Sequence, residues 1–279
     1  MVKKNATYTK NVEKVGDDCM NFLLTNDDGI SSPGLAAIVE VMKQYGKVFV
    51  VCPNQDKSAV GHSITFRESL KVKETNIFGE NVKAWTVNGT PADCVKMALE
   101  VLVPNEIDFV VSGMNIGSNV GRDSYYSGTI GGAREGSYYG IPAVAVSLDI
   151  FAVQLTDFAE SKKIFMNVMS IILQNKYAEN LLLNINIPNI SEAQCKGIKF
   201  AELDFSIQRH SYVEERDLSG EAAYWLRGQP AQLTFAALEG DFILLQEGYV
   251  TVTPLEIQMT NQANKDEIDQ WFNESLVLQ

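Results

Sequence analysis

Two adjacent carboxylates, Asp27 and Asp28, follow a short apolar run at residues 22–24 and precede Gly29. Consecutive side chains on a regular strand point to opposite faces, so both carboxylates can face one cation only where the chain turns. Gly29 permits such a turn because glycine adopts backbone angles that other residues avoid. The residues alone leave two interpretations: an acidic turn that caps a helix, or half of a cation site.

A helix is predicted to begin near Pro33, because Leu35, Ile38, Val39 and Met42 recur at helical spacing. The order of elements is therefore a strand, an acidic turn and a helix. In α/β proteins built this way, ligands bind beyond the carboxyl ends of the parallel strands. The acidic turn occupies that position.

Oxygen-bearing side chains also follow two further predicted strands. Ser58 lies in the polar loop after the apolar run 47–51, and Asn115 follows the run 107–112. Carboxylate, hydroxyl and amide oxygens suit Mg²⁺ or Mn²⁺ better than zinc. We therefore predict a site for one divalent metal ion at the strand ends, with Asp27, Asp28, Ser58 and Asn115 as ligands.

Ser127, Gly128 and Thr129 lie in a glycine-rich stretch directly before a predicted helix at residues 130–139. Helix N-termini attract anions, so these residues could offer backbone amides and a hydroxyl to a phosphate group. The alternative interpretation is that they only cap the helix.

The alternation of strands and helices from residue 22 to residue 187 predicts an α/β fold with a doubly wound, mostly parallel, Rossmann-like sheet in three layers. Residues 66–85 are expected to form short strands or a hairpin that turns near Gly79. From residue 197 the pattern changes to short strand-like pieces at 198–203, 222–226, 242–244 and 249–253, with a final helix at 264–272. We expect an N-terminal extension at 1–20, a catalytic core at 21–196 and a β-rich C-terminal extension at 197–279.

Several common catalytic motifs are missing from the sequence: GxGxxG after the first strand, GxxxxGK[ST] and GxSxG. Their absence argues against a dinucleotide-binding protein, a P-loop enzyme and a serine hydrolase with a nucleophile elbow. His62 follows Ser58 by four residues, yet a nucleophile and its base normally come from separate elements. Two interpretations of His62 stay open: a role in catalysis, or a loop residue that hydrogen-bonds nearby backbone.

The chain has 279 residues and a net charge of −12, without a run rich in Lys or Arg. This balance argues against a nucleic-acid polymer or an anionic membrane as the main partner. No apolar stretch approaches the roughly 18 residues that a membrane span requires, and residues 1–18 lack the apolar segment of a signal peptide. The four cysteines are scattered without a CxxC pair, so we expect a reduced, cytoplasmic protein.

Taken together and in order, several segments resemble the SurE family of metal-dependent 5'/3'-nucleotidases. These segments are residues 26–30 (NDDGI), 58–63 (SAVGHS), 88–95 (NGTPADCV), 112–117 (SGMNIG), 126–129 (YSGT), 224–225 (YW) and 248–255 (GYVTVTPL). The similarity runs collinearly from residue 22 to residue 260. It departs from the family at residues 1–20, at Ile116 and Ser118, and at residues 218–219.

The resemblance implies a phosphatase that hydrolyses nucleoside 5'- and 3'-monophosphates, and in some members short polyphosphate. It places the metal ligands on Asp27, Asp28, Ser58 and Asn115, the set that the strand ends indicate. It places phosphate binding on Ser127, Gly128 and Thr129, and we add Asn26 to these substrate-binding residues. Family members are homodimers or homotetramers in which the C-terminal extension reaches a partner.

The sequence is compatible with three hypotheses for the chemistry. A water molecule activated by the metal ion could attack phosphorus, with Asp27 as a ligand, as the base, or as a nucleophile. A nucleotide-binding module without catalysis is a second hypothesis, although two carboxylates beside a phosphate would weaken anion binding. A metal-free phosphatase that uses Ser58 as its nucleophile is a third.

Overall fold

The computed structural model describes residues 19–150, 157–178, 180–216, 220–233, 239–261 and 264–275. The predicted N-terminal extension, except its last two residues, lies outside these ranges. All four cysteines carry free thiols. Within the described residues, no helix is both long enough and apolar enough to cross a membrane.

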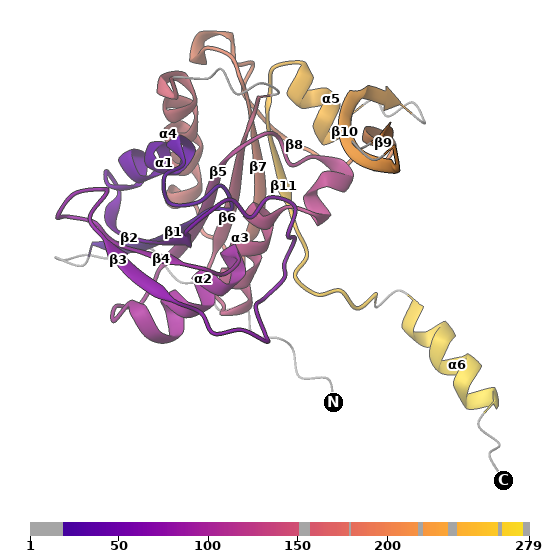
Figure 1. The fold of residues 1–279 in the computed structure, drawn as a ribbon, viewed down its shortest axis with the longest axis horizontal. Coiled ribbons are helices and arrows are strands. Elements are labelled where there is room, and N and C mark those ends of the chain that lie inside the picture. The colour runs from indigo at the N-terminus through magenta and orange to yellow at the C-terminus, as the bar shows by residue number, and fades with distance from the viewer. Residues whose placement is uncertain are drawn as a thin grey trace.

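A nine-stranded sheet forms the centre of the molecule, in the order β3-β4-β2-β1-β5-β6-β7-β11-β8 (Figure 1). Six neighbouring strands run parallel: β1 (Met20–Thr25), β2 (Gly46–Pro53), β4 (Lys83–Val87), β5 (Phe109–Ile116), β6 (Ala143–Asp149) and β7 (Leu182–Pro188). The chain first builds β2 and β4 on one side of β1 and then places β5 on the other side. The strand order therefore reverses between β1 and β5, where ligands of open α/β sheets bind.

Helices cover both faces of the sheet. The helix α1 (Pro33–Met42) packs with α4 (Ala159–Gln174), and α2 (Pro91–Met97) packs with α3 (Gly128–Tyr138) (Figure 1). The strand β1 serves both layers, because Phe22 and Leu24 enter one hydrophobic cluster and Leu23 enters the other. Side chains that alternate between two faces and are buried on both are the pattern of a central parallel strand, and this confirms the predicted three-layer α/β fold.

Short turns of other helix types join these elements. They are the π-helical turn η1 (Ala98–Leu102) and the 3-10 turns η2 (Gly121–Tyr125) and η3 (Glu192–Gln194). The hairpin expected within residues 66–85 forms as β3 (Val72–Thr75) paired antiparallel with β4. Gly79 lies in its connection with φ +84°, as predicted.

The C-terminal part contributes to two sheets. The strands β8 (Ile198–Phe200) and β11 (Val250–Pro254) extend the main sheet beyond β7, so that sheet crosses the expected boundary at residue 197. A separate antiparallel pair is formed by β9 (Ile207–Arg216) and β10 (Ala222–Leu233). The helix α6 (Lys265–Ser275) lies apart from the body of the molecule (Figure 1).

The strand expected at residues 242–244 is wrong, because these residues belong to the helix α5 (Asp241–Gln246). A short apolar run fits a buried strand and one turn of a buried helix equally well. Tertiary packing decides here, since Asp241, Leu244 and Leu245 are all buried on one side of α5.

Candidate functional site

The chain turns sharply at the carboxyl end of β1. Gly29 has φ +93°, and a Cβ atom there would lie 3.3 Å from the backbone carbon of Gln55. Asn26 is fully buried and its Nδ2 donates to the Gly29 carbonyl at 3.0 Å. The Ile30 N–H donates to the carbonyl of Pro53 at 3.1 Å, which ties the turn to the end of β2. The predicted turn at Gly29 is therefore present.

Asp27 is almost entirely buried, and its Oδ1 accepts a 2.5 Å hydrogen bond from the hydroxyl of Thr129 on α3. Burial raises the pKa of Asp27, and the Thr129 hydroxyl partly offsets this rise. Asp28 is half-buried. Burial, followed by the charges of Asp27 and Asp56, raises the pKa of Asp28 to about 7.

One oxygen of this carboxylate pair has no hydrogen-bond partner. The Oδ2 atom of Asp28 is buried and accepts no hydrogen bond from the part of the chain that the structure describes. A buried carboxylate oxygen without a partner carries a large desolvation cost. The pair is therefore costly as it stands, and a cation between the two carboxylates would remove that cost.

Ser58 reaches the site on the loop that follows β2. The Lys57 N–H donates to the Asp27 carbonyl at 2.7 Å, and the Ser58 N–H donates to Asp56 Oδ1 at 2.7 Å. The loop therefore touches the backbone of Asp27, while the Ser58 side chain itself remains exposed.

Asn115 reaches the site from β5, the other neighbour of β1. Pairing between β5 and β6 is irregular from Ser112 to Asn115, and Asn115 is half-buried. Its Nδ2 donates to the Gly117 carbonyl at 2.6 Å, so the side-chain oxygen is left as an acceptor for another group. The next residue, Ile116, directs its backbone N–H to Asp28.

The N-terminus of α3 lies directly against Asp27. Ser127 caps this helix, since its Oγ accepts from the Ile130 N–H at 3.1 Å. A Cβ atom at Gly128 would lie 2.9 Å from the Cβ of Asp27, so only glycine allows this approach. The hydroxyls of Ser127 and Thr129 and the Ile130 N–H all have protein partners, and the Thr129 N–H hydrogen-bonds Asp27. The start of α3 therefore offers an anion the Gly128 N–H, together with a Thr129 N–H that the anion would share with Asp27.

Comparison with known proteins places this arrangement in a family. The family described as "Survival protein SurE" matches residues 22–210. The chain belongs to the SurE family. A 5'-nucleotidase SurE from Clostridium beijerinckii is 39% identical over 259 residues, covering 91% of this chain and 99% of that protein. A 5'-nucleotidase SurE from Carboxydothermus hydrogenoformans is 36% identical over 254 residues, covering 90% of this chain and 96% of that protein.

The fold is shared as well. The crystal structure of the SurE protein from Aquifex aeolicus superposes with a TM-score of 0.77 at 35% identity, covering 90% of this chain and 99% of that one. The SurE resemblance carried by the sequence motifs is thus confirmed over most of the chain.

The donor set of this SurE protein fits a hard divalent cation. Among the described residues, no group of three or more His, Cys, Asp or Glu side chains is arranged to hold a metal ion. A metal at the strand ends would therefore need neutral oxygen ligands beside Asp27 and Asp28, and Ser58 and Asn115 are of that type. The unpartnered Asp28 Oδ2 is an oxygen that such an ion could bind without displacing a hydrogen bond.

His62 contacts a side chain of another element. Its Nε2 lies 2.8 Å from Oε2 of Glu135 on α3, so the interpretation as a loop residue that bonds nearby backbone does not describe this contact. The sequence could not indicate this partner, which is 73 residues away. Four tyrosines near the two ends of α3 are all exposed: Tyr125, Tyr126, Tyr138 and Tyr139.

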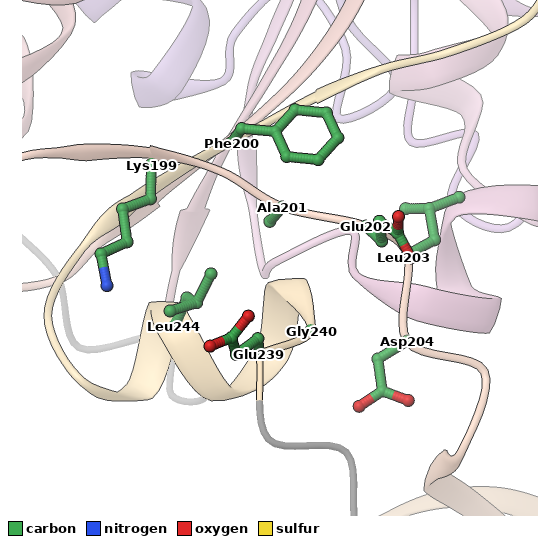
Figure 2. Close-up of a pocket in the computed structure, with 9 residues that line it drawn as sticks. All are labelled: Lys199, Phe200, Ala201, Glu202, Leu203, Asp204, Glu239, Gly240 and Leu244. Atoms are coloured by element: carbon green, nitrogen blue, oxygen red, sulfur yellow. The ribbon is translucent and has the colours of Figure 1, made fainter.

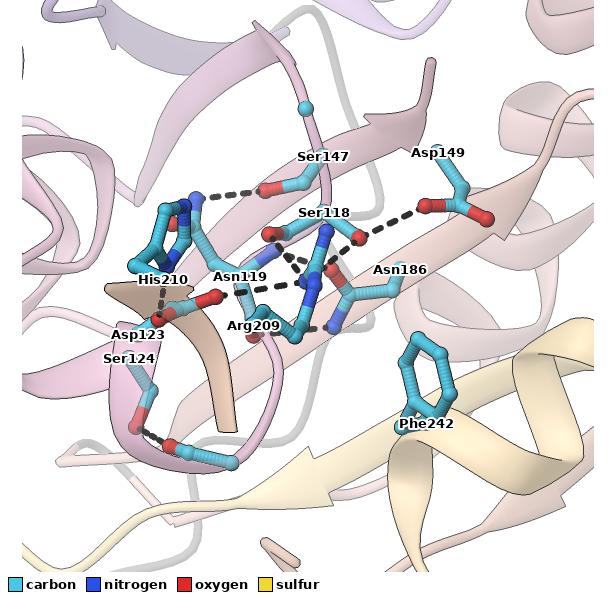
Figure 3. Close-up of polar contacts among 12 residues, drawn as sticks. Ser118, Asn119, Asp123, Ser124, Ser147, Asp149, Asn186, Arg209, His210 and Phe242 are labelled. Carbon is cyan, nitrogen blue, oxygen red and sulfur yellow. Dashed lines mark hydrogen bonds and ion pairs between the residues drawn. The ribbon is translucent and has the colours of Figure 1, made fainter. Parts of the chain in front are cut away.

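A buried polar network beside the site was not predicted (Figure 3). We call it the Arg209 cluster. Its members are Ser118, Asn119, Asp123, Ser147, Asn184, Asn186, Arg209 and Asp241. Arg209 Nη1 lies 3.3 Å from Asp123 Oδ2 and donates to Ser118 Oγ at 3.1 Å.

The Arg209 cluster fixes the segment that joins Asn115 to α3. The Asn119 N–H donates to Asn186 Oδ1 at 2.7 Å, and its Nδ2 donates to Ser147 Oγ at 2.8 Å (Figure 3). The Gly121 N–H donates to Asp241 Oδ2 at 2.8 Å. One sequence signal existed: two asparagines in the apolar run of β7, Asn184 and Asn186, which are both fully buried.

A cavity of about 520 Å³ lies elsewhere, between β8 and α5 (Figure 2). It is lined by Lys199, Phe200, Ala201, Glu202, Leu203, Asp204, Glu239, Gly240 and Leu244. None of the residues predicted for the metal or the substrate lines it, so this cavity is separate from the candidate site.

Proposed function

We propose that this protein is a metal-dependent phosphomonoesterase that hydrolyses nucleoside 5'- and 3'-monophosphates, and also short polyphosphate. The relatives named 5'-nucleotidase SurE support the nucleotidase activity. One observation carries the metal requirement: a buried carboxylate pair with an unpartnered oxygen at the switch point of the sheet, next to a helix N-terminus.

In this proposal Asp27, Asp28, Ser58 and Asn115 hold one divalent ion, Mg²⁺ or Mn²⁺. When bound, such an ion neutralises phosphate charge and lowers the pKa of a water molecule that attacks phosphorus, releasing nucleoside and inorganic phosphate. The amides of Gly128 and Thr129 bind the phosphate oxygens at the start of α3.

The remaining roles follow from the contacts. Thr129 holds the Asp27 carboxylate in place through its hydroxyl. Asn26 shapes the turn that brings both carboxylates to one side, and through this turn it contributes to substrate binding. Asp27 serves as a ligand, as the base for the attacking water, or as a nucleophile. Only the last role predicts an acyl phosphate that can be trapped on Asp27 by acid quenching.

The direct test measures phosphate release from AMP, GMP, their 3' isomers, tripolyphosphate and phenyl phosphate. Each substrate is assayed with Mn²⁺, with Mg²⁺ and with excess EDTA. We expect activity that EDTA abolishes and added metal restores. Activity that is indifferent to EDTA would favour the metal-free Ser58 phosphatase, and nucleotide binding without any release would favour the binding module.

We further propose that residues 197–279 act as an oligomerisation extension of a core at 21–196, giving a homodimer or homotetramer in the cytoplasm. Large apolar side chains on β9 and β10 support this, since Tyr212, Tyr224, Trp225 and Leu226 are each more than half exposed. Light scattering coupled to size exclusion tests it. Replacing Tyr224 and Trp225 with serine should lower the mass to that of a smaller species, and an unchanged mass would contradict this surface as the interface.

A further inference from the structure

The loop that carries Ser58 lies along the helix α3. Its Gly61 N–H donates to the Tyr126 carbonyl at 2.8 Å. A Cβ atom at Gly131 would lie 2.4 Å from the Gly61 carbonyl oxygen, and one at Gly128 would lie 3.1 Å from Val60 Cγ2. The loop therefore packs closely on the helix, against its backbone at two glycines that leave room for no side chain of their own.

We call this line of contact between the Ser58 loop and α3 the seam. A side-chain contact extends it by one helical turn. His62 Nε2 lies 2.8 Å from Glu135 Oε2, with 23% of the histidine side chain and 11% of the glutamate side chain exposed. The His62 ring also lies 5.2 Å from the ring of Tyr138, measured between centroids. Hydrogen bonds to a carboxylate in so sheltered a place are stronger than those in open solvent.

The loop needs such anchors, because its backbone is not relaxed. Ala59, between Ser58 and the seam, has φ +57°, a left-handed conformation that L-residues with a Cβ rarely adopt. A conformation of this kind persists only where the surroundings hold it. Before Ser58 the holding contact is the Lys57 N–H on the Asp27 carbonyl, and after it the first contacts are those of Gly61 and His62. Further along the loop, the Thr90 hydroxyl donates to the Ser63 carbonyl at 2.7 Å.

We propose that His62 is a positioning residue for the metal site. By hydrogen-bonding Glu135 it holds the Ser58 loop against α3, and it thereby sets the position of Ser58 relative to Asp27. This inference rests on the proposed function, in which Ser58 is a metal ligand. It assigns His62 no contact with the reacting atoms and no proton transfer.

The test compares His62→Ala, which removes the contact, with His62→Gln, whose Nε2 can still donate to Glu135. The control is Lys162→Met, which breaks the 2.6 Å Lys162–Glu40 pair between α4 and α1, away from the loop. Three measurements are made on each protein: hydrogen exchange at the Gly61 amide without metal, the Kd for Mn²⁺ by calorimetry, and kcat and KM for AMP.

For His62→Ala we expect faster exchange at Gly61 and a Kd for Mn²⁺ that rises about 10- to 100-fold, the usual effect of losing a residue that orients a ligand. His62→Gln should recover most of both properties, and Lys162→Met should match the wild type. If His62→Ala does not fold, Glu135→Gln, which keeps an acceptor oxygen, should show a smaller loss in the same two measurements.

Unchanged exchange and unchanged Mn²⁺ affinity in a folded His62→Ala protein would overturn the proposal. A His62→Gln protein with normal Mn²⁺ affinity and the low kcat of His62→Ala would also overturn it, because His62 would then move a proton. Failure of the proposed function looks different: wild-type protein would neither bind Mn²⁺ nor release phosphate, while the exchange at Gly61 would still respond to His62→Ala.

Discussion

Two buried polar regions lie at the carboxyl ends of neighbouring strands. They differ in whether their charged side chains have partners within the protein. Around Asp27 and Asp28, two acids stand side by side, and no ion pair of the described residues includes either. In the Arg209 cluster the buried guanidinium faces Asp123, and Asp241 accepts from the backbone N–H groups of Gly121, Asp204 and Phe242.

This difference indicates that the Asp27–Asp28 region is the candidate active site and that the Arg209 cluster supports its structure. Removing the protein partner of a buried charge destabilises a fold, whereas a buried charge without a protein partner is tolerated where a ligand completes it. The Arg209 cluster fixes residues 118–121, next to Asn115. We therefore expect substitutions in the first region to remove activity and substitutions in the second to remove stability.

The largest expected effect is on turnover. Asp28→Asn and Asp27→Asn should each lower kcat/KM for AMP by at least about 100-fold at saturating Mn²⁺, since losing even an outer partner of a metal ligand costs 10- to 100-fold. Asp108→Asn, at the opposite end of β1, where Asp108 accepts from the Asn21 N–H, should keep its activity. Near-normal turnover in Asp28→Asn with full Mn²⁺ binding would remove the first region from the active site.

The second expected effect is on unfolding. Arg209→Met should lower the free energy of unfolding by about 2 to 3 kcal/mol, because the hydrogen bonds of a buried charged group are lost. The Asp123 carboxylate would also lose its contact with Arg209 and keep the one with His210 at 3.4 Å. Urea unfolding followed by circular dichroism measures this.

The control is Lys163→Met. Lys163 pairs with Glu160 at 2.5 Å on the exposed face of α4, and surface pairs contribute little to stability. Equal losses in the two variants would contradict the supporting role of the Arg209 cluster.

How much of each region the sequence predicts depends on the range of its contacts. The acidic turn is local: an apolar strand, two aspartates and Gly29 lie within eight residues, so its geometry can be derived from neighbours in the chain. The parallel order of the strands follows from their alternation with helices. Ser58 and Asn115 could be predicted as ligands because strand ends meet at one edge, and their role as ligands stays a prediction.

The Arg209 cluster has no such local pattern. Its contacts join residues 91, 67 and 120 positions apart, and only the fold brings them together. The same holds for His62 and Glu135. The helix α5 was missed for the opposite reason, since its apolar run is too short to show a period and the contacts that decide its conformation are tertiary.

The two regions also differ in how pH acts on them. The pKa of Asp28 is raised to about 7 in the fold from an ordinary value of 3.8, so the metal-free folded protein binds a proton that the unfolded chain releases. This stabilising contribution is fully present below about pH 4 and is lost as pH rises through about 7. Thermal unfolding should therefore show a lower Tm at pH 8 than at pH 5.

Asp28→Asn tests this contribution, because Asp27 and Asp241, whose pKa values burial also raises, are common to both proteins. Without metal, the variant should exceed the wild type in Tm at pH 8 and approach it at pH 4. Saturating Mn²⁺ should raise the wild-type Tm most at high pH, where protons no longer compete for the carboxylates. If the difference in Tm between the two proteins did not change with pH, an uncompensated negative charge on Asp28 would be contradicted.

The smallest expected effect concerns Ser127, which caps α3 and lies next to the candidate active site. Ser127 caps α3, so Ser127→Ala should cost about 1 kcal/mol of unfolding free energy, the usual loss for an N-cap. If the start of α3 also binds phosphate, the same variant should raise KM for AMP several-fold with little change in kcat. Ser191→Ala, which removes the 2.8 Å hydrogen bond from Ser191 Oγ to Gln194 Oε1 before η3, away from the site, should lower stability alone. A KM unchanged by Ser127→Ala would make this serine a cap and nothing more, and would leave phosphate binding to the backbone amides of Gly128 and Thr129.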